Sequence, residues 1–310
     1  MGFLIDFIKG IFVGVANVIP GVSGGTMAVS FGIYDKLISS VTGLLKKFKE
    51  SFKTLLPIVL GMAFGVVAFT FIIPVILKHQ PFITATAFTG LIIGGLPALV
   101  ATLKEKKKLK PSPLPLNFLI FMIMFAISAI MPFMGGDKES GNLLSPTPAT
   151  MVIVFFMGVI AAASMVIPGV SGSLMLMILG YYFGIITCLR DFISALKDFD
   201  MAVMVDRGLV LAPFALGCIV GIFFIAKIIE WLLSKHPVAT YWGILGLVVS
   251  SPISIYYKVN QEFPLAGTST LMIILGVVIG IICMGLTYYI GNLDVKTPDK
   301  PADVASKKEA

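Results

Sequence analysis

The chain has 310 residues, of which 57% are hydrophobic and only 13% are charged. Soluble domains carry about 25% charged residues. This composition, with a mean hydropathy of +1.01, therefore excludes soluble, disordered, collagen-like and disulfide-scaffold proteins and indicates a polytopic membrane protein. The net charge of +7 rests on lysines clustered at 46–53 and 104–110. Such clusters between apolar runs favour contact with anionic lipid headgroups, and without an aromatic-basic module we expect no nucleic-acid partner.

Six apolar runs are long enough to cross the bilayer core, which takes about 20 apolar residues. They lie at 55–77, 82–101, 115–134, 210–233, 238–257 and 269–290. Two further apolar stretches, 8–34 and 156–186, are interrupted in the middle by Pro, Gly and Ser. Each half has about 11 or 12 residues, or roughly 17 Å of helix, which is half a membrane.

The two interruptions are near-identical, reading NVIPGVSGGTMAVSFGIY at 17–34 and MVIPGVSGSLMLMILGYY at 165–182. They lie 148 positions apart, and the correspondence continues at an offset of 156, where Gly61 and Gly65 match Gly217 and Gly221. The chain is therefore two copies of one unit within a single membrane domain, 1–310. We assign the first repeat to 1–147, the second to 148–291 and a polar tail to 292–310.

Each unit holds one interrupted segment and three spanning helices. If that segment is a re-entrant helical hairpin, each unit crosses the membrane three times and the second copy is inverted. If it is a kinked span, each unit crosses four times and the copies are parallel.

We favour hairpins because Pro20 and Pro168 break the first arm, and the Gly and Ser that follow suit a reversal. Most lysines then share one side, which the positive-inside rule makes cytoplasmic. The sequence thus predicts an all-α polytopic protein of two inverted-topology repeats in the cytoplasmic membrane. Both termini, and with them the polar tail, are expected in the cytoplasm.

In inverted hairpins the two tips meet near the midplane, and the second arm of each begins directly after PGVS. Its free N–H groups come from Gly24, Gly25 and Thr26 in the first copy and from Gly172, Ser173 and Leu174 in the second, with hydroxyls from Ser23 and Ser171 beside them. A helix N-terminus offers unpaired donors and about half a positive charge, which suits phosphate or carboxylate. The alternative is that the serines are plain N-caps and the glycines only allow close packing.

The paired motifs PGVSGGT and PGVSGS on an eight-segment scaffold resemble the polyprenyl-phosphate transporter family, of the PopT type, over essentially the whole chain. The resemblance implies a transporter, or flippase, that returns undecaprenyl phosphate, the lipid carrier of cell-wall sugars, to the inner leaflet. By motif position the implied binding residues are Ser23, Gly24, Gly25, Thr26, Ser171, Gly172 and Ser173. Since Ser173 replaces the second glycine and Leu174 the threonine, the two half-sites are unequal. We expect neither catalysis nor a cofactor or metal.

Three other polar residues are candidates. Asn17, just ahead of the first tip, is the best additional polar ligand. Arg190, one turn beyond the second arm, either receives phosphate at the mouth of the site or pairs with a neighbouring aspartate in a solvated loop. Glu230 lies in a span three residues after Lys227, where the two charges neutralise each other or the carboxylate carries a coupling proton.

Two other functions stay open. An undecaprenyl-pyrophosphate phosphatase also uses inverted repeats with hairpins, and its PGxSRS signature resembles PGVSG. However, Gly24 and Gly172 stand where that enzyme has arginine, and paired carboxylates near the first hairpin are lacking. A transporter of a small anion could be built on the same hairpins. We expect a lipid phosphate and the bilayer as partners, and leave open coupling to protons or sodium ions and assembly into a homo-oligomer.

Overall fold

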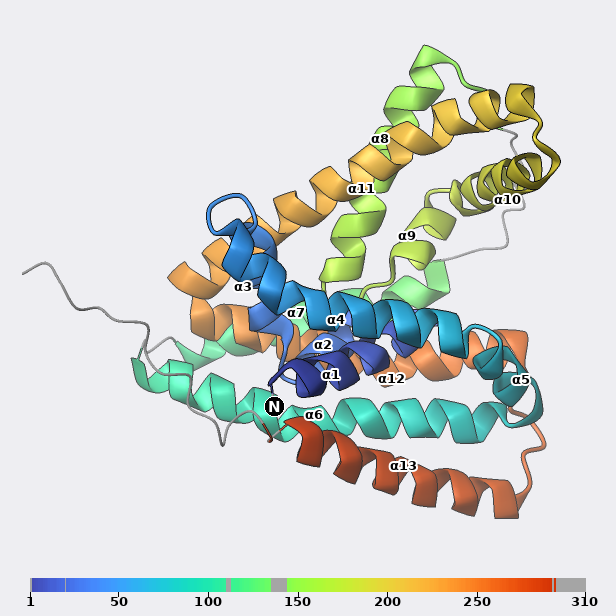
Figure 1. Ribbon diagram of the computed structural model, residues 1–310. Coiled ribbons are helices and arrows are strands. Elements are labelled where there is room, and N and C mark those ends of the chain that lie inside the picture. Colours follow the sequence, from blue (N-terminus) through green and yellow to red (C-terminus); the bar gives the residue numbers. More distant parts are fainter. Residues whose placement is uncertain (1, 20, 110–112, 135–143, 292, 294–310) are drawn as a thin grey trace, which may run out of the picture.

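The computed structural model describes residues 2–19, 21–109, 113–134, 144–291 and 293 (Figure 1). This part of the chain folds into thirteen α-helices and no strands. Seven helices are long and apolar enough to span a membrane: α4 (Phe48–Phe69), α6 (Pro81–Leu109), α7 (Leu114–Met134), α8 (Pro148–Val166), α11 (Met201–Lys235), α12 (Pro237–Glu262) and α13 (Thr270–Gly291). The others are α1 (Gly2–Ala16), α2 (Gly24–Ser30), α3 (Tyr34–Gly43), α5 (Ile72–His79), α9 (Gly172–Ile178) and α10 (Tyr182–Asp198). The prediction of an all-helical multi-pass membrane protein is confirmed.

The interrupted segments have unequal arms, and the predicted length of 11 or 12 residues per arm is wrong. The first arms, α1 and α8, have 15 and 19 residues, whereas the second arms, α2 and α9, have 7 each. The helix α8 starts early because Thr147 caps it, its hydroxyl accepting from the Thr150 N–H at 3.2 Å. Gly32 and Gly180, with φ of +71° and +80°, lie just beyond α2 and α9, where the left-handed backbone ends both helices. After this turn α10 leaves α9 at 114°.

Corresponding helices of the two copies make corresponding contacts. The helix α1 packs along α4 as α8 packs along α11. A Cβ at Gly61 would collide with the carbonyl oxygen of Phe7, and one at Gly217 would collide with that of Phe155, so both pairs need the same close approach. The last two spans are exchanged between copies, because α6 packs on α13 while α7 packs on α12.

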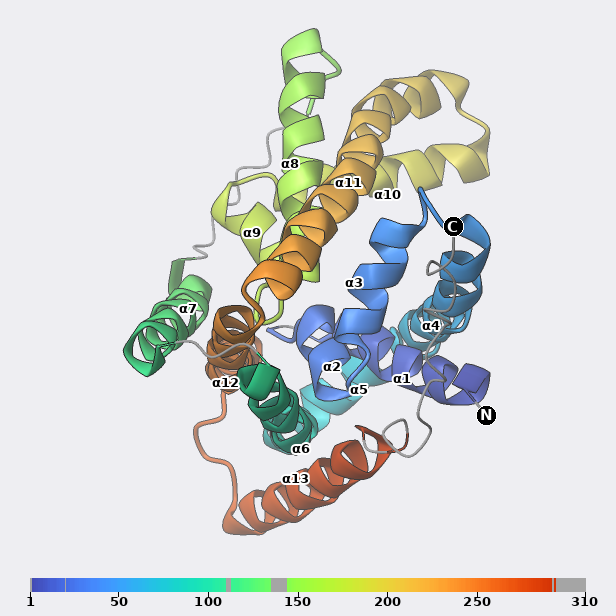
Figure 2. The same cartoon turned by 90° about the vertical axis from the view of Figure 1, so that its left-hand side faces the viewer.

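The centre of the molecule is the contact between α6 and α12, the matching spans of the two copies. In the apolar 18-residue stretch of each helix, 50% of α6 and 61% of α12 is buried, compared with 11% of α7 and 17% of α13. The peripheral helices therefore present apolar side chains to the lipid. Figures 1 and 2 show α8 to α11 standing apart from the rest, with α3 beside α11.

Candidate substrate-binding site

The described residues of the two VIPGVSG motifs share a left-handed glycine and the start of a helix. Gly21 and Gly169 take φ of +79° and +76°, and α2 and α9 begin at Gly24 and Gly172, as the sequence predicts. Ser23 and Ser171 take the N-cap positions with extended backbone, but neither side chain caps its helix. The serines therefore occupy the N-cap positions, as the alternative interpretation predicts, but their hydroxyls do not make the capping hydrogen bond.

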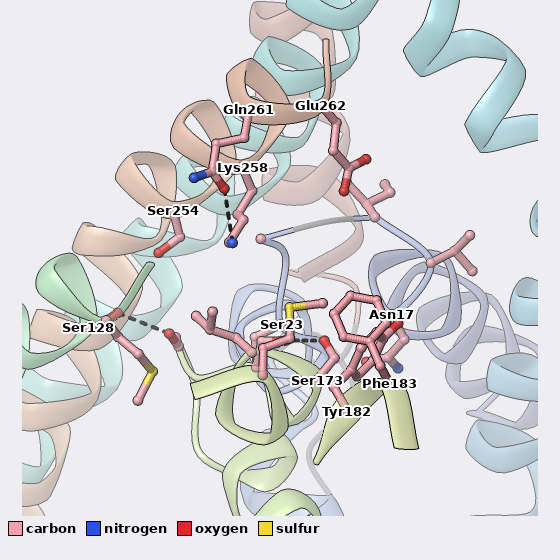
Figure 3. A pocket seen from close by; sticks show the side chains of 18 of the residues that line it. Asn17, Ser23, Ser128, Ser173, Tyr182, Phe183, Ser254, Lys258, Gln261 and Glu262 are labelled. Carbon is pink, nitrogen blue, oxygen red and sulfur yellow. Dashed lines mark hydrogen bonds between the residues drawn. The ribbon is translucent and has the colours of Figure 1, made fainter. Parts of the chain in front are cut away.

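A cavity of about 520 Å³ lies between these turns and the C-terminal part of α12 (Figure 3). Its polar lining comes from both motifs and three helices: Asn17, Ser23, Ser128, Ser171, Ser173, Tyr182, Ser254, Lys258, Gln261 and Glu262. Apolar residues such as Val18, Leu174 and Phe183 complete the wall. Both tips thus contribute to one concave site, which is large enough for a phosphate headgroup and the start of a lipid chain.

The motif hydroxyls differ in their hydrogen bonding. The Ser23 oxygen is buried and has no hydrogen-bond partner, in a residue only 6% exposed. Ser171 and Ser173 share a hydrogen bond of 2.9 Å between their hydroxyl oxygens at the surface of the cavity. The Asn17 amide donates to the Val13 carbonyl at 3.1 Å. A buried hydroxyl without a partner is costly unless a ligand completes its bonding, so Ser23 marks the polar floor of the site.

Four polar residues of α12 line the cavity and were missed by the sequence analysis: Ser254, Lys258, Gln261 and Glu262. Figure 3 shows Lys258 reaching from α12 toward the motif turns, and its ammonium donates to the Gln261 side-chain oxygen at 3.0 Å. Glu262 lies one helical turn further on and also lines the cavity. The signal was available, because Ser254, Lys258 and Glu262 follow one another at intervals of four and so share one helix face.

Four predicted ligands are used for packing rather than for lining the cavity. The Thr26 hydroxyl accepts a hydrogen bond from the Gly169 N–H at 2.7 Å. It also forms a hydrogen bond with the Ser251 hydroxyl, with 3.3 Å between the two oxygens. A Cβ at Gly24 would lie 2.8 Å from the Asn17 side-chain oxygen. Close approach also explains the other two glycines. A Cβ at Gly25 would lie 3.0 Å from the Val166 carbonyl oxygen, and a Cβ at Gly172 would lie 2.6 Å from the Ala161 carbonyl oxygen.

The remaining predicted residues lie away from the cavity. Arg190 is exposed on α10, and it is Arg207 that pairs with the carboxylates of Asp191, at 3.3 Å, and Asp206, at 3.4 Å. Glu230 is exposed on α11, and no ion pair to Lys227 is found within the described residues.

Comparison with known proteins decides the family. Residues 13–269 match the VCA0040-like family, described as undecaprenyl phosphate translocase-like. The chain belongs to this family. The resemblance read from the paired motifs is thereby confirmed.

Two relatives of this VCA0040-like chain cover most of its length. A polyprenyl-phosphate transporter of Staphylococcus aureus is 28% identical over 279 residues, which cover 89% of this chain and 94% of the relative. A polyprenyl-phosphate transporter of Vibrio cholerae is 28% identical over 265 residues, covering 81% and 77%. No solved structure matches the chain.

Proposed function

We propose that this protein moves a polyprenyl phosphate, undecaprenyl phosphate in particular, between the leaflets of the cytoplasmic membrane without changing it chemically. The observation that carries the proposal is the cavity of about 520 Å³ in which Ser23, Ser171 and Ser173 of the two motifs face Lys258. Hydroxyl donors and one ammonium suit a phosphate monoester. The hydrocarbon chain of the lipid stays in the bilayer, which accepts it.

Inverted repeats belong to this proposal. The corresponding helices α6 and α12 run in opposite directions in Figure 1, and the exchange of α7 and α13 between copies is what a two-fold relation would give. These features support three crossings per copy with both interrupted segments re-entrant. Both termini then lie in the cytoplasm, the Lys258 end of α12 faces the opposite side, and the carrier returns inward for another round of cell-wall synthesis.

The proposed phosphate ligands differ from the motif-based set. Ser23, Ser171, Ser173 and Asn17 stay in it because they line the cavity, and Lys258 joins them. The glycines and Thr26 shape the turns that carry the serines. Arg190 and Glu230 take no part, since neither lines the cavity.

The test is leaflet exchange of a fluorescent or radiolabelled undecaprenyl phosphate in liposomes that contain the purified protein, with and without a proton or sodium gradient. Ser23→Ala and Lys258→Gln should slow exchange about tenfold each. Lys78→Gln, which removes an exposed lysine that does not line the cavity, is the matched control and should exchange at the normal rate.

A parallel assay decides between transport and hydrolysis. Purified protein is incubated with undecaprenyl pyrophosphate, with and without divalent metal, and released phosphate is measured. Release at an enzymatic rate that disappears in Ser23→Ala would replace the transporter by a phosphatase. Exchange of small anions but not of the lipid phosphate would instead identify a small-anion transporter.

A further inference from the structure

A second cavity, of about 110 Å³, lies at the opposite end of the α6–α12 pair and repeats the lining of the large one. One side of it is formed by Val29, Gly32, Tyr34 and Asp35, and 148 positions later Met177, Gly180, Tyr182 and Phe183 line the large cavity. Its α6 side contains Ala98 and Thr102, and 156 positions later Ser254 and Lys258 line the large cavity. The two cavities are therefore the same feature of the two repeats, one wide and one narrow.

Two hydrogen bonds between the copies hold the narrow cavity shut. The Tyr241 hydroxyl of α12 donates to the Asp35 carboxylate at the start of α3, and Tyr241 is only 4% exposed. The Tyr34 hydroxyl donates to the Val166 carbonyl, at the end of α8, at 3.2 Å. Both bonds tie α3 of the first copy to helices of the second, across the place where the cavity would widen.

The bond between Tyr241 and Asp35 has no equivalent at the wide cavity. At the position of Asp35 the second copy has Phe183, and at the position of Tyr241 the first copy has Ala85. No hydrogen bond can form between these two side chains. The closure that uses a carboxylate is thus present on one side only, which favours the arrangement in which the large cavity is open.

We propose that the narrow cavity is a second binding site for the lipid phosphate, facing the other side of the membrane, which opens when the large cavity closes. This inference rests on the proposed function. Opening requires Tyr241 to leave Asp35, and it would bring the Thr102 hydroxyl to the position that Lys258 has in the large cavity. Among the described residues, the lining of this second site holds the Asp35 carboxylate and no lysine, whereas that of the large cavity holds both Lys258 and Glu262, so the second site binds the phosphate more weakly than the first.

The experiment uses two cysteine reporters at repeat-related positions, Ala98→Cys and Ser254→Cys, in a background without the native cysteines. The purified protein in detergent is treated with a bulky maleimide, which reaches both faces of the protein but is larger than the narrow cavity, so it should label Ser254→Cys quickly and Ala98→Cys slowly. Removing the closure with Tyr241→Phe should raise labelling at position 98 several-fold and lower it at position 254. Tyr289→Phe, which removes a hydroxyl from the lipid-facing surface of α13, is the control and should change neither.

The reciprocal change separates the inference from simple loosening of the fold. A rise at both reporters, or no change at either in a folded Tyr241→Phe protein, overturns the second site. If Tyr241→Phe does not fold, Tyr34→Phe removes the other bond and must give the same reciprocal change. If lipid phosphate exchanges in liposomes but labelling at both reporters is unchanged by Tyr241→Phe, the second site is overturned and the proposed function still holds. Reciprocal labelling without exchange overturns the proposed function and supports the paired cavities.

Discussion

Replacement of Thr26 by valine tests whether this motif residue holds the two copies together or binds the substrate. The Thr26 side chain is fully buried, and its hydroxyl oxygen accepts the Gly169 N–H and contacts the Ser251 hydroxyl. Valine keeps the shape and removes both bonds, leaving the Gly169 N–H of the opposite motif without its partner. Each lost bond of this kind costs about 1 kcal/mol, so the free energy of unfolding should fall by about 1–2 kcal/mol.

Thr89→Val is the matched control, because the Thr89 hydroxyl oxygen is buried without a hydrogen-bond partner. The same chemical change there removes no bond and should leave stability unchanged or slightly higher. The assay is the apparent melting temperature of the purified protein in one detergent at one heating rate. We expect Thr26→Val to melt about 2–8 °C below the parent, from about 2–4 °C per kcal/mol in a chain of this size.

Ser23→Ala should give the opposite pair of results. The Ser23 hydroxyl has no partner in the protein, so its loss should leave the melting temperature near that of the parent. If it donates to phosphate, binding of the lipid phosphate should weaken by about 1.5–3 kcal/mol, or more than tenfold. Equal melting shifts for Thr26→Val and Thr89→Val, or a Thr26→Val protein that is stable and fails only in binding, would refute this division of roles.

Three further predictions concern topology, helix packing and charge. Cysteines placed in the C-terminal tail and at Lys107 should both resist an impermeant reagent added outside; if only one reacts, the copies are not inverted. Gly90→Leu should reduce folded yield because a Cβ there collides with the Gly280 carbonyl, whereas Gly285→Leu, which meets open space, should not; equal yields would show that α6 and α13 separate easily. Lys258→Gln should weaken lipid-phosphate binding and flatten its dependence on salt concentration; an unchanged salt dependence would place the anion away from α12.

The sequence predicts the spans and the turns well because both depend on local chemistry. Apolar runs of bilayer length predicted six of the seven spanning helices, and the repeated PGVSG motif predicted the break and the start of each second arm. The seventh, α8, was missed because its start depends on the cap at Thr147, which lies before the apolar run. The short second arms follow from the turns at Gly32 and Gly180, which the sequence contains but which were treated as part of the helices.

The site was only partly predictable because one wall of it is made by packing. The Cβ that Gly21 lacks would lie 2.5 Å from the Ser254 carbonyl oxygen, and the one that Gly169 lacks would lie 2.6 Å from that of Leu247. Both turns therefore rest on α12, and this contact brings Lys258 and its neighbours over the serines. No local pattern specifies which span crosses both turns, so the sequence analysis did not place Lys258 at the site.

Divergence within the duplicated motif explains why the two tips contribute differently to the large cavity. Every residue of α2 is buried, and Thr26 bonds to the opposite turn, so the first tip is fixed to the second copy. At the matching position the second copy has Leu174, which has no hydroxyl to return that bond. The second tip is consequently free to expose Ser171 and Ser173 to the cavity, while the first tip contributes the buried Ser23 hydroxyl. One tip is thus fixed to the opposite copy and the other is exposed, and under the proposed function we expect the exposed tip to move when the phosphate is released.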